Sequence, residues 1–247
     1  MNILVACKIV PDDQDVKVAG DGSLDFSRAH KVVSTYDLNA IEAAAQIAAA
    51  NDGSTVKAIS VGPKKADDSK TKKNILARGV DELFLAADDA LDGLDAFATA
   101  AELAKLAAKA GDWDVIVTGD GSADLYAKQT GVQLAAKLGV PFVSGVVSAE
   151  AADGKLVAKR LLESEEETVE VPLPAVVSVA PEFAEPRIAG MKDILAAGKK
   201  PMNVEGAEGA PAKAVEEVSV KAPAEVDRKK EMFDDVDAFA AAVKAAL

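Results

Sequence analysis

Short runs of apolar, β-branched residues alternate with alanine-rich stretches of helical periodicity over the first 140 residues, and this alternation constrains the fold most strongly. The first run is NILVACKIV, read as one strand, and further runs follow at TVKAISVG, ELFLAA and DVIVTG. They are short and nearly continuously apolar, as expected of parallel strands covered by helices on both faces. The sequence predicts an α/β fold with a doubly wound, mostly parallel sheet and right-handed crossovers.

Helical patterns fill the stretches between these strands. An alanine-rich helix is predicted over residues 37–53, with Asp37 as its N-cap and Gly53 just past its end. Further helices are expected at 67–79, 95–111 and 130–139. If the strand order is 3-2-1-4-5, it reverses between the first strand and DVIVTG, and doubly wound sheets bind ligands at such a reversal.

The pattern changes after Val140. Turn signals at Asp153-Gly154 and Ser164-Glu165 separate short apolar runs, which predicts an insertion of three or four antiparallel strands. The run LPAVVSVA is expected to return to the main sheet, and a short helix follows over Gly190–Gly198.

Residues 201 to about 231 are rich in Pro, Ala, Gly and charge, which predicts an extended C-terminal arm with little core of its own. An amphipathic helix ends the chain, with one apolar face made of Val236, Phe239, Val243 and Leu247. Such a helix docks on a partner or packs back on its own domain. We divide the chain into residues 1–200 and 201–247.

Charge and cysteine content exclude several classes of protein. The formal net charge is −13, so there is no basic footprint for nucleic acid. The single cysteine permits no intrachain disulfide and indicates a reducing compartment. The chain has no apolar stretch long enough to span a membrane, and its N-terminus lacks the features of a signal peptide. A cytoplasmic protein is expected.

The loop GDGSADLYAKQTG, residues 119–131, leaves the strand DVIVTG at the expected crevice. Its glycines permit tight turns, and the helix that starts near Gln129, Thr130 and Gly131 would direct free N–H groups at an anion. Its aspartates disfavour a triphosphate without a metal, so a monophosphate fits better. The pattern has neither the Walker nor the Rossmann spacing, and a plain helix-entry loop is the alternative.

Catalytic groups are not evident. Cys7 lies inside a predicted strand and is interpreted as a buried thiol, and His30 is the only histidine. The acidic run Glu163–Glu167 is interpreted as a solvated hairpin turn. Since no nucleophile is paired with a base, the sequence indicates a binding protein and not an enzyme.

Several segments together resemble the β subunit of electron transfer flavoproteins. They are ILVACKIVPD, STYDLNAIEAA, GDGSADLYAKQTG and above all LPAVVSVAPEFAEPRIAGMKDILAAGKKP. The combination of GSLDFSRAHKVVSTYDLNAIEAA with GDGSADLYAKQTG looks closest to the FixA-type branch. The resemblance implies an obligate heterodimer in which the α subunit carries a redox-active FAD and the β subunit binds a structural AMP. It implies electron transfer from a flavin dehydrogenase, classically acting on acyl-CoA, to a quinone-linked oxidoreductase or another acceptor.

The resemblance also assigns residues. Residues 1–200 become an adenine-nucleotide-binding domain, and the arm at 201–247 would wrap on the α subunit. The implied AMP-binding residues are Ala6, Ser34, Thr35, Tyr36, Asp37, Val61, Asp124, Lys128, Gln129, Thr130 and Gly131. The implied dehydrogenase-docking residues are Glu185, Pro186, Arg187, Met191, Ile194 and Leu195, with Met191 as the apolar anchor.

The nucleotide loop departs from the family's mitochondrial-type pattern, which has more aspartates and an Asn where Lys128 stands. A related electron-bifurcating branch binds a second FAD in place of AMP and has a Val-Gly-Pro-like ending. The sequence Thr130-Gly131-Val132 favours AMP, and a second FAD stays open. A stand-alone nucleotide-binding regulator of the universal-stress type would share the architecture but has no need for the arm. A nucleotide-dependent ligase is a further alternative, but it would need a set of reactive side chains that is not evident in the sequence.

Overall fold

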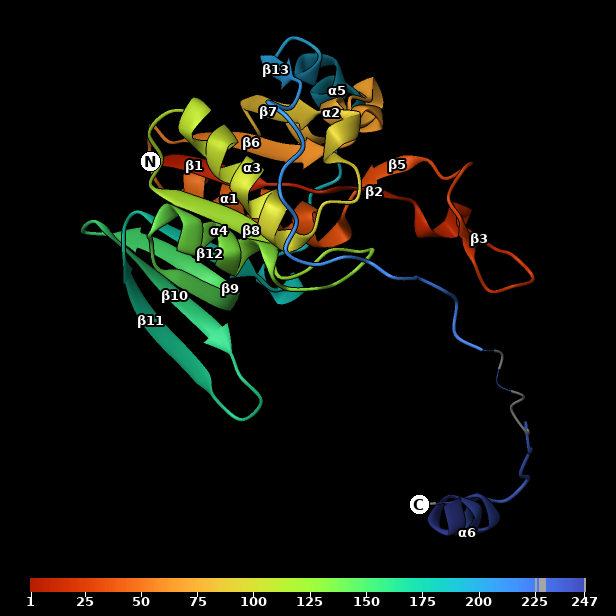
Figure 1. Ribbon diagram of the computed structural model, residues 1–247. Helices are drawn as coiled ribbons and strands as arrows, with labels where there is room; N and C mark the ends of the chain where they lie inside the picture. The colour runs from red at the N-terminus through yellow and green to blue at the C-terminus, as the bar shows by residue number, and fades with distance from the viewer. Residues whose placement is uncertain (225, 227–229, 247) are drawn as a thin grey trace.

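The computed structural model describes residues 1–224, 226 and 230–246, and these form a nine-stranded sheet covered by helices (Figure 1). The sheet order is β11-β10-β9-β12-β8-β1-β6-β7-β13. The strands are β1 (Asn2–Ala6), β6 (Thr55–Gly62), β7 (Glu82–Ala87), β8 (Val115–Gly119), β9 (Phe142–Ala152), β10 (Lys155–Leu161), β11 (Glu166–Pro172), β12 (Ala175–Val179) and β13 (Met202–Glu205).

The central part of the sheet is parallel and has the predicted order. Strands β7, β6, β1, β8 and β12 lie side by side, and every pairing among them is parallel. In chain order this is 3-2-1-4-5, so the doubly wound topology is confirmed and the reversal lies between β1 and β8.

Alternate residues of the central strands enter two apolar cores, one on each face. Ile3 and Val5 pack against α1 (Thr35–Ala49) and α2 (Ser69–Leu76), whereas Leu4 packs against α3 (Ala96–Lys109) and α4 (Thr130–Leu138). This is why the strands read as continuous apolar runs, since both of their faces are buried. The remaining helices are α5 (Met191–Ala197) and α6 (Val236–Ala246), with short 3-10 turns at Asp13–Asp15, Lys64–Ala66, Asp89–Leu91 and Pro181–Phe183.

The antiparallel insertion consists of β9, β10 and β11, and β12 then returns to the centre of the sheet as predicted. Asp153 and Gly154 both have positive φ, which suits the tight turn between β9 and β10. The turn between β10 and β11 contains Ser164 and closes with a bond from Leu162 N to the carbonyl of Glu165.

The first apolar run is not one strand, so that prediction was wrong. The run NILVACKIV divides into β1 and β2 (Ile9–Pro11), and β2 leaves the main sheet to pair with β5 (Lys31–Val33). The break is at Lys8, whose N–H donates to Asp37 and whose carbonyl accepts from Ser34 N. Between β2 and β5, a small hairpin forms from β3 (Lys17–Val18) and β4 (Leu24–Asp25).

The first part of the C-terminal arm packs on its own domain. Strand β13 pairs with β7 at the edge of the sheet. Farther on, Ala214 and Val215 donate to Asp95, and Ala222 donates to the carbonyl of Gly22 in the hairpin.

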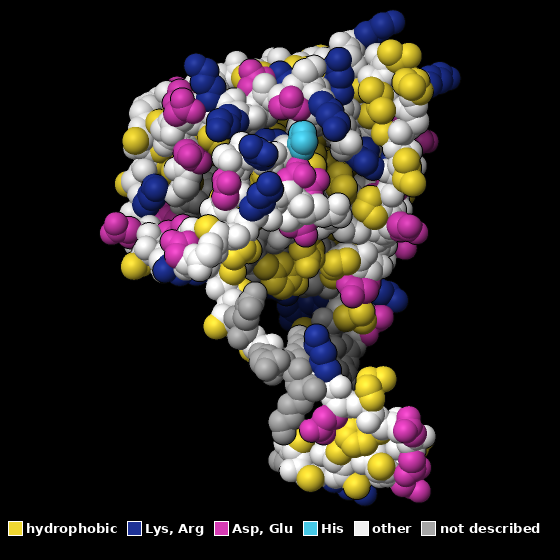
Figure 2. Space-filling model, turned by 90° about the vertical axis from the view of Figure 1, so that its right-hand side faces the viewer, with side chains coloured by type: hydrophobic (Ala, Val, Ile, Leu, Met, Phe, Trp, Pro, Cys, Tyr) yellow, Lys and Arg dark blue, Asp and Glu magenta, His cyan; other side chains and the backbone are white. Residues whose placement is uncertain are grey.

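Helix α6 stands apart from the main body, and its apolar side chains are exposed (Figures 1 and 2). They include Val236, Phe239 and Val243, whereas Leu247 lies outside the described residues. Across the part of the chain that the structure describes, no helix is both long and apolar enough to cross a membrane.

Candidate functional site

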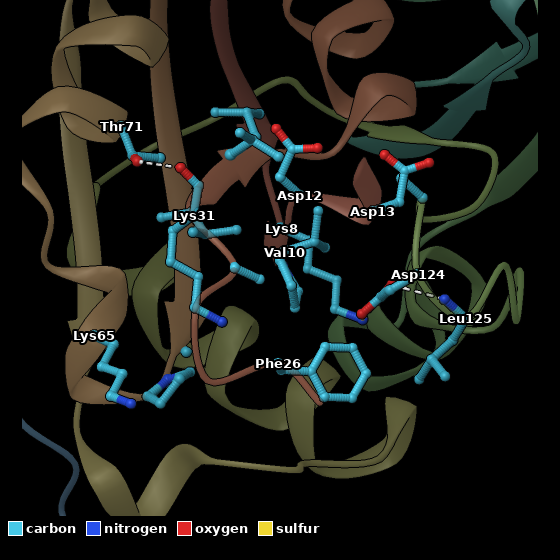
Figure 3. A pocket seen from close by; sticks show the side chains of 18 of the residues that line it. Lys8, Val10, Asp12, Asp13, Phe26, Lys31, Lys65, Thr71, Asp124 and Leu125 are labelled. Atoms are coloured by element: carbon cyan, nitrogen blue, oxygen red, sulfur yellow. Dashed lines mark hydrogen bonds and ion pairs between the residues drawn. The ribbon is translucent and has the colours of Figure 1, made fainter. Parts of the chain in front are cut away.

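A cleft of about 1570 Å³ opens beside the carboxyl end of β1, at the edge of the sheet where the strand order reverses (Figure 3). Its walls come from the residues after β1, the first turn of α1, the β3–β4 hairpin and the middle of the loop after β8. The end of β6, α2 and the segment that leads into α3 complete them. Figure 3 shows Lys8 and Asp124 together on one wall, with Lys31 and Lys65 on the other. The cleft therefore lies where the topology predicts a ligand.

Asp37 joins the two strands at the reversal from beneath the cleft. Its carboxylate accepts a bond from Lys8 N at 2.7 Å and one from Gly119 N at 3.3 Å. Burial raises the pKa of Asp37 to about 7, against the opposing effect of these two N–H groups. The predicted N-cap role of Asp37 was wrong. The N-cap of α1 is Ser34, and the carboxylate of Asp37 instead accepts hydrogen bonds from the backbone at the ends of β1 and β8.

The loop over residues 119–131 is shaped by close approaches at its glycines. A Cβ at Gly119 would lie 2.7 Å from Asp37 Oδ1 and 2.9 Å from Tyr36. A Cβ at Gly121 would overlap the ring of Tyr126, which packs 4.9 Å from the ring of Tyr36 between centroids. Tyr126 itself has a φ of 47°, an unusual value for a residue with a side chain. The loop is thus fitted to the first turn of α1.

Acidic side chains in this loop are neutralised by nearby cations. Asp124 forms an ion pair with Lys8 at 2.6 Å and also accepts bonds from Ser122 Oγ and Leu125 N. The Lys8 and Ser122 bonds hold the pKa of Asp124 below its usual range despite its partial burial. Asp120 pairs with Lys128 at 2.6 Å, a contact that raises the pKa of Lys128. The loop therefore has little net charge.

The predicted nucleotide residues fall into three places. Thr35, Tyr36, Val61 and Asp124 line the cleft. Ala6, Ser34 and Asp37 are buried beneath it, where Ser34 Oγ accepts a bond from Ala123 N at 3.2 Å. Lys128, Gln129, Thr130 and Gly131 are at the far end of the loop, around the start of α4, and are not among the cleft-lining residues.

Close packing explains why position 131 is a glycine, because a Cβ there would lie 2.8 Å from Thr118 Oγ1 on β8. The glycine allows α4 to approach the sheet closely.

Several cleft residues were missed by the sequence analysis. Lys8 lies two residues past the end of β1 at the reversal, but the sequence analysis placed it inside a single first strand. The wall formed by the 3-10 turn at Asp89–Leu91 and the start of α3, which includes Leu91 and Leu94, carries no motif. Phe26, just after β4, carries none either. Val220 of the arm also lines the cleft, and no local pattern predicts that contact.

The docking segment, defined as residues 185–198, exposes apolar side chains on and before α5. The exposed fraction is 94% for Ile188, 77% for Met191 and 68% for Leu195. Met191 therefore does not pack on the core. Of the other predicted docking residues, Arg187 forms an ion pair with Glu42, and Ile194 is exposed. Glu185 and Pro186 directly precede Arg187 in the chain.

The other candidate side chains, Cys7 and His30, lie in different surroundings. Cys7 is buried, and its pKa is raised well above the usual value by burial and secondarily by Asp37. The exposed ring of His30 contacts the carboxylate of Asp15 at 2.7 Å. Among the residues that the structure describes, no group of three or more His, Cys, Asp or Glu could hold a metal ion.

The family model described as the electron transfer flavoprotein domain matches residues 22–223, which are 202 of the 247 residues. The match covers part of the cleft wall, the glycine loop, the docking segment and the arm as far as the hairpin contact.

Proposed function

We propose a function that proceeds from one premise: the chain belongs to the electron transfer flavoprotein family. Within that family we propose that it is the β subunit, of the FixA-type branch, in a cytoplasmic heterodimer. Its crevice binds AMP as a structural ligand, and the redox-active FAD is carried mainly by the α subunit. The chain is an electron-carrier subunit without catalytic residues of its own.

The observation that carries this proposal is the crevice at the strand reversal. Its lining combines the half-buried side chains of Tyr36 and Val61, suited to a nucleoside, with the polar side chains of Thr35 and Asp124. The phosphate would extend past the cleft lining to the start of α4, whose first-turn N–H groups and Thr130 hydroxyl are suited to bind it.

The charge balance of the loop supports a monophosphate. Lys8 and Lys128 are already paired with Asp124 and Asp120, so the loop has no surplus of positive charge for a triphosphate. Backbone amides and a helix N-terminus are sufficient for one phosphate group.

The proposed mechanism is positional. The chain supports the FAD domain of the α subunit and presents the docking segment to a flavin dehydrogenase, classically of the acyl-CoA type. The exposed Met191 acts as a flexible apolar anchor, which suits a transient complex. Electrons then pass through the α-subunit flavin to a quinone-linked oxidoreductase or another acceptor.

The volume of the cleft favours a second candidate. At about 1570 Å³, it exceeds the 300–1000 Å³ or so that small ligands usually occupy. A second FAD in place of AMP would use more of this space, and the subunit would then belong to an electron-bifurcating flavoprotein.

The test is to express this chain together with its α subunit, denature the purified complex and identify the released nucleotides by chromatography. One FAD and one AMP per heterodimer are expected. Two FAD without AMP would replace the first candidate by the second. A chain that is well behaved alone and does not bind the α subunit would contradict both and favour a stand-alone nucleotide-binding protein.

A further inference from the structure

The docking segment is poorly supported by apolar packing. Along α5, only Ala197 is buried, and the exposed side chains point away from the core. Part of the segment and the end of α2 together line a pocket of about 240 Å³. Other contacts must therefore hold the segment in place.

Two buried side chains of α1 supply those contacts. Asn39 Nδ2 donates to the carbonyl of Ala184 at 2.7 Å and to that of Pro181 at 3.3 Å. Glu42 accepts from Arg187 three times, from Nε at 2.6 Å, from Nη2 at 3.0 Å and from the backbone N at 3.2 Å. Asn39 and Glu42 are one helical turn apart on α1, so Asn39 binds the residues just before the docking segment and Glu42 binds Arg187 within it.

Neighbouring residues hold Arg187 in the position that pairs with Glu42. Arg78 of the α2 end donates to the carbonyl of Arg187, so both the side chain and the backbone of Arg187 are fixed. A Cβ at Gly79 would lie 3.3 Å from Arg187 Nη1, so the glycine leaves room for the guanidinium. Because two parallel bonds join the guanidinium to the carboxylate, they fix the orientation of the Arg187 side chain as well as its distance from Glu42.

From this geometry we infer that Asn39 and Glu42 are positioning residues for the docking surface. They hold the stretch from Ala184 to Arg187, so that Ile188, Met191 and Leu195 are presented in a fixed arrangement before a partner arrives. Preorganisation of this kind lowers the entropy that docking must overcome. The inference rests on the proposed docking function and extends it to two residues that are themselves buried.

The experiment uses the intact heterodimer and compares Glu42→Gln with the control Glu102→Gln. Glu102 is also a buried helical glutamate with an ion pair, to Lys105, but it lies on α3. We expect Glu42→Gln to speed hydrogen exchange across residues 185–197 at least tenfold and the control to leave it unchanged. Asn39→Ala serves as a second variant should Glu42→Gln fold poorly.

Steady-state reduction by an acyl-CoA dehydrogenase gives a readout that a merely structural role would not move. We expect Glu42→Gln and Asn39→Ala to raise the KM for the heterodimer about fivefold with kcat little changed and the bound nucleotide retained. Combining Glu42→Gln with Met191→Ala should raise KM less than the product of the two single effects.

Two outcomes would overturn the inference in distinguishable ways. If Met191→Ala raises KM while both α1 variants leave KM and exchange unchanged, the positioning role fails and the docking role stands. If Met191→Ala leaves KM unchanged, the docking role itself fails and the positioning role fails with it.

Discussion

Asp37 stabilises the two strand ends at the reversal, but its burial disfavours the charged form of its carboxyl group. Its carboxylate satisfies the N–H groups of Lys8 and Gly119, at the ends of two neighbouring parallel strands, where the sheet ladder no longer pairs them. The same burial that makes these bonds valuable disfavours the charged form of the carboxyl group.

This conflict predicts a pH dependence of stability. The pKa of Asp37 is about 7 when folded and near 3.8 when unfolded, so between these values the folded protein holds a proton that the unfolded chain has lost. The free energy of unfolding should fall as pH rises through this window, by about 1.4 kcal/mol for each unit of pKa difference.

The comparison with Asp37→Asn isolates this contribution. In urea unfolding from pH 5 to pH 8, wild type should lose about 1.4 kcal/mol per pH unit relative to the variant up to about pH 7, and the difference should then level off. A difference that is constant across the whole range would show that Asp37 is charged throughout.

Gly119 is a second residue whose role follows from close contact. We expect Gly119→Ala to destabilise the fold by about 1–3 kcal/mol, because its Cβ would press on Asp37 and Tyr36. Gly20→Ala is the matched control, since nothing lies within 4 Å of its Cβ position, and it should change stability by less than about 0.5 kcal/mol. Equal denaturation midpoints for the two variants would contradict the packing argument.

At the scale of elements, helix caps attach the arm to the domain. Asp88 and Asp95 each cap their own helix with Oδ1 and accept from the arm with Oδ2, Asp88 from Ala207 N and Asp95 from Ala214 and Val215. The arm is thereby held beside α3 on its way to the hairpin.

Asp95→Asn should release the arm without unfolding α3. The amide oxygen of Asn still caps the helix, but its amide nitrogen faces two N–H donors and leaves them unpaired. We expect limited proteolysis within residues 206–222 to become several-fold faster while the melting temperature barely changes. Asp68→Asn, at a cap whose contacts are confined to α2, should leave arm cleavage as in wild type.

Elements defined by local patterns could be predicted from the sequence, whereas contacts between distant parts of the chain could not. The strand order and the crevice followed from local patterns, since two buried faces and alternating helices leave few topologies. The division of the first run at Lys8 depends on Asp37, 29 residues away, and β13 depends on pairing with β7. The Glu42–Arg187 pair joins residues 145 apart, and no local pattern indicates it. Contacts of this range are set by tertiary structure alone.

At the scale of the whole molecule, the exposed apolar face of α6 is the surface that we expect to contact the α subunit in the proposed heterodimer. Phe239→Asp should leave the stability of the chain alone unchanged, because the side chain is exposed, and should weaken binding to the α subunit about tenfold. Ala241→Asp adds the same charge on the other side of the helix and should bind nearly as wild type. Equal binding of both variants to the α subunit, measured by calorimetry, would place the interface elsewhere.

The exposure of Ile188, Met191 and Leu195 has a consequence for how such a protein diversifies. These side chains contribute little to folding, so exchanging them costs less than about 0.5 kcal/mol of stability. The crevice and the α1 contacts are under far stricter steric demands. Under the docking role proposed above, single substitutions at these three side chains would therefore change the choice of electron donor while the nucleotide-binding crevice is kept.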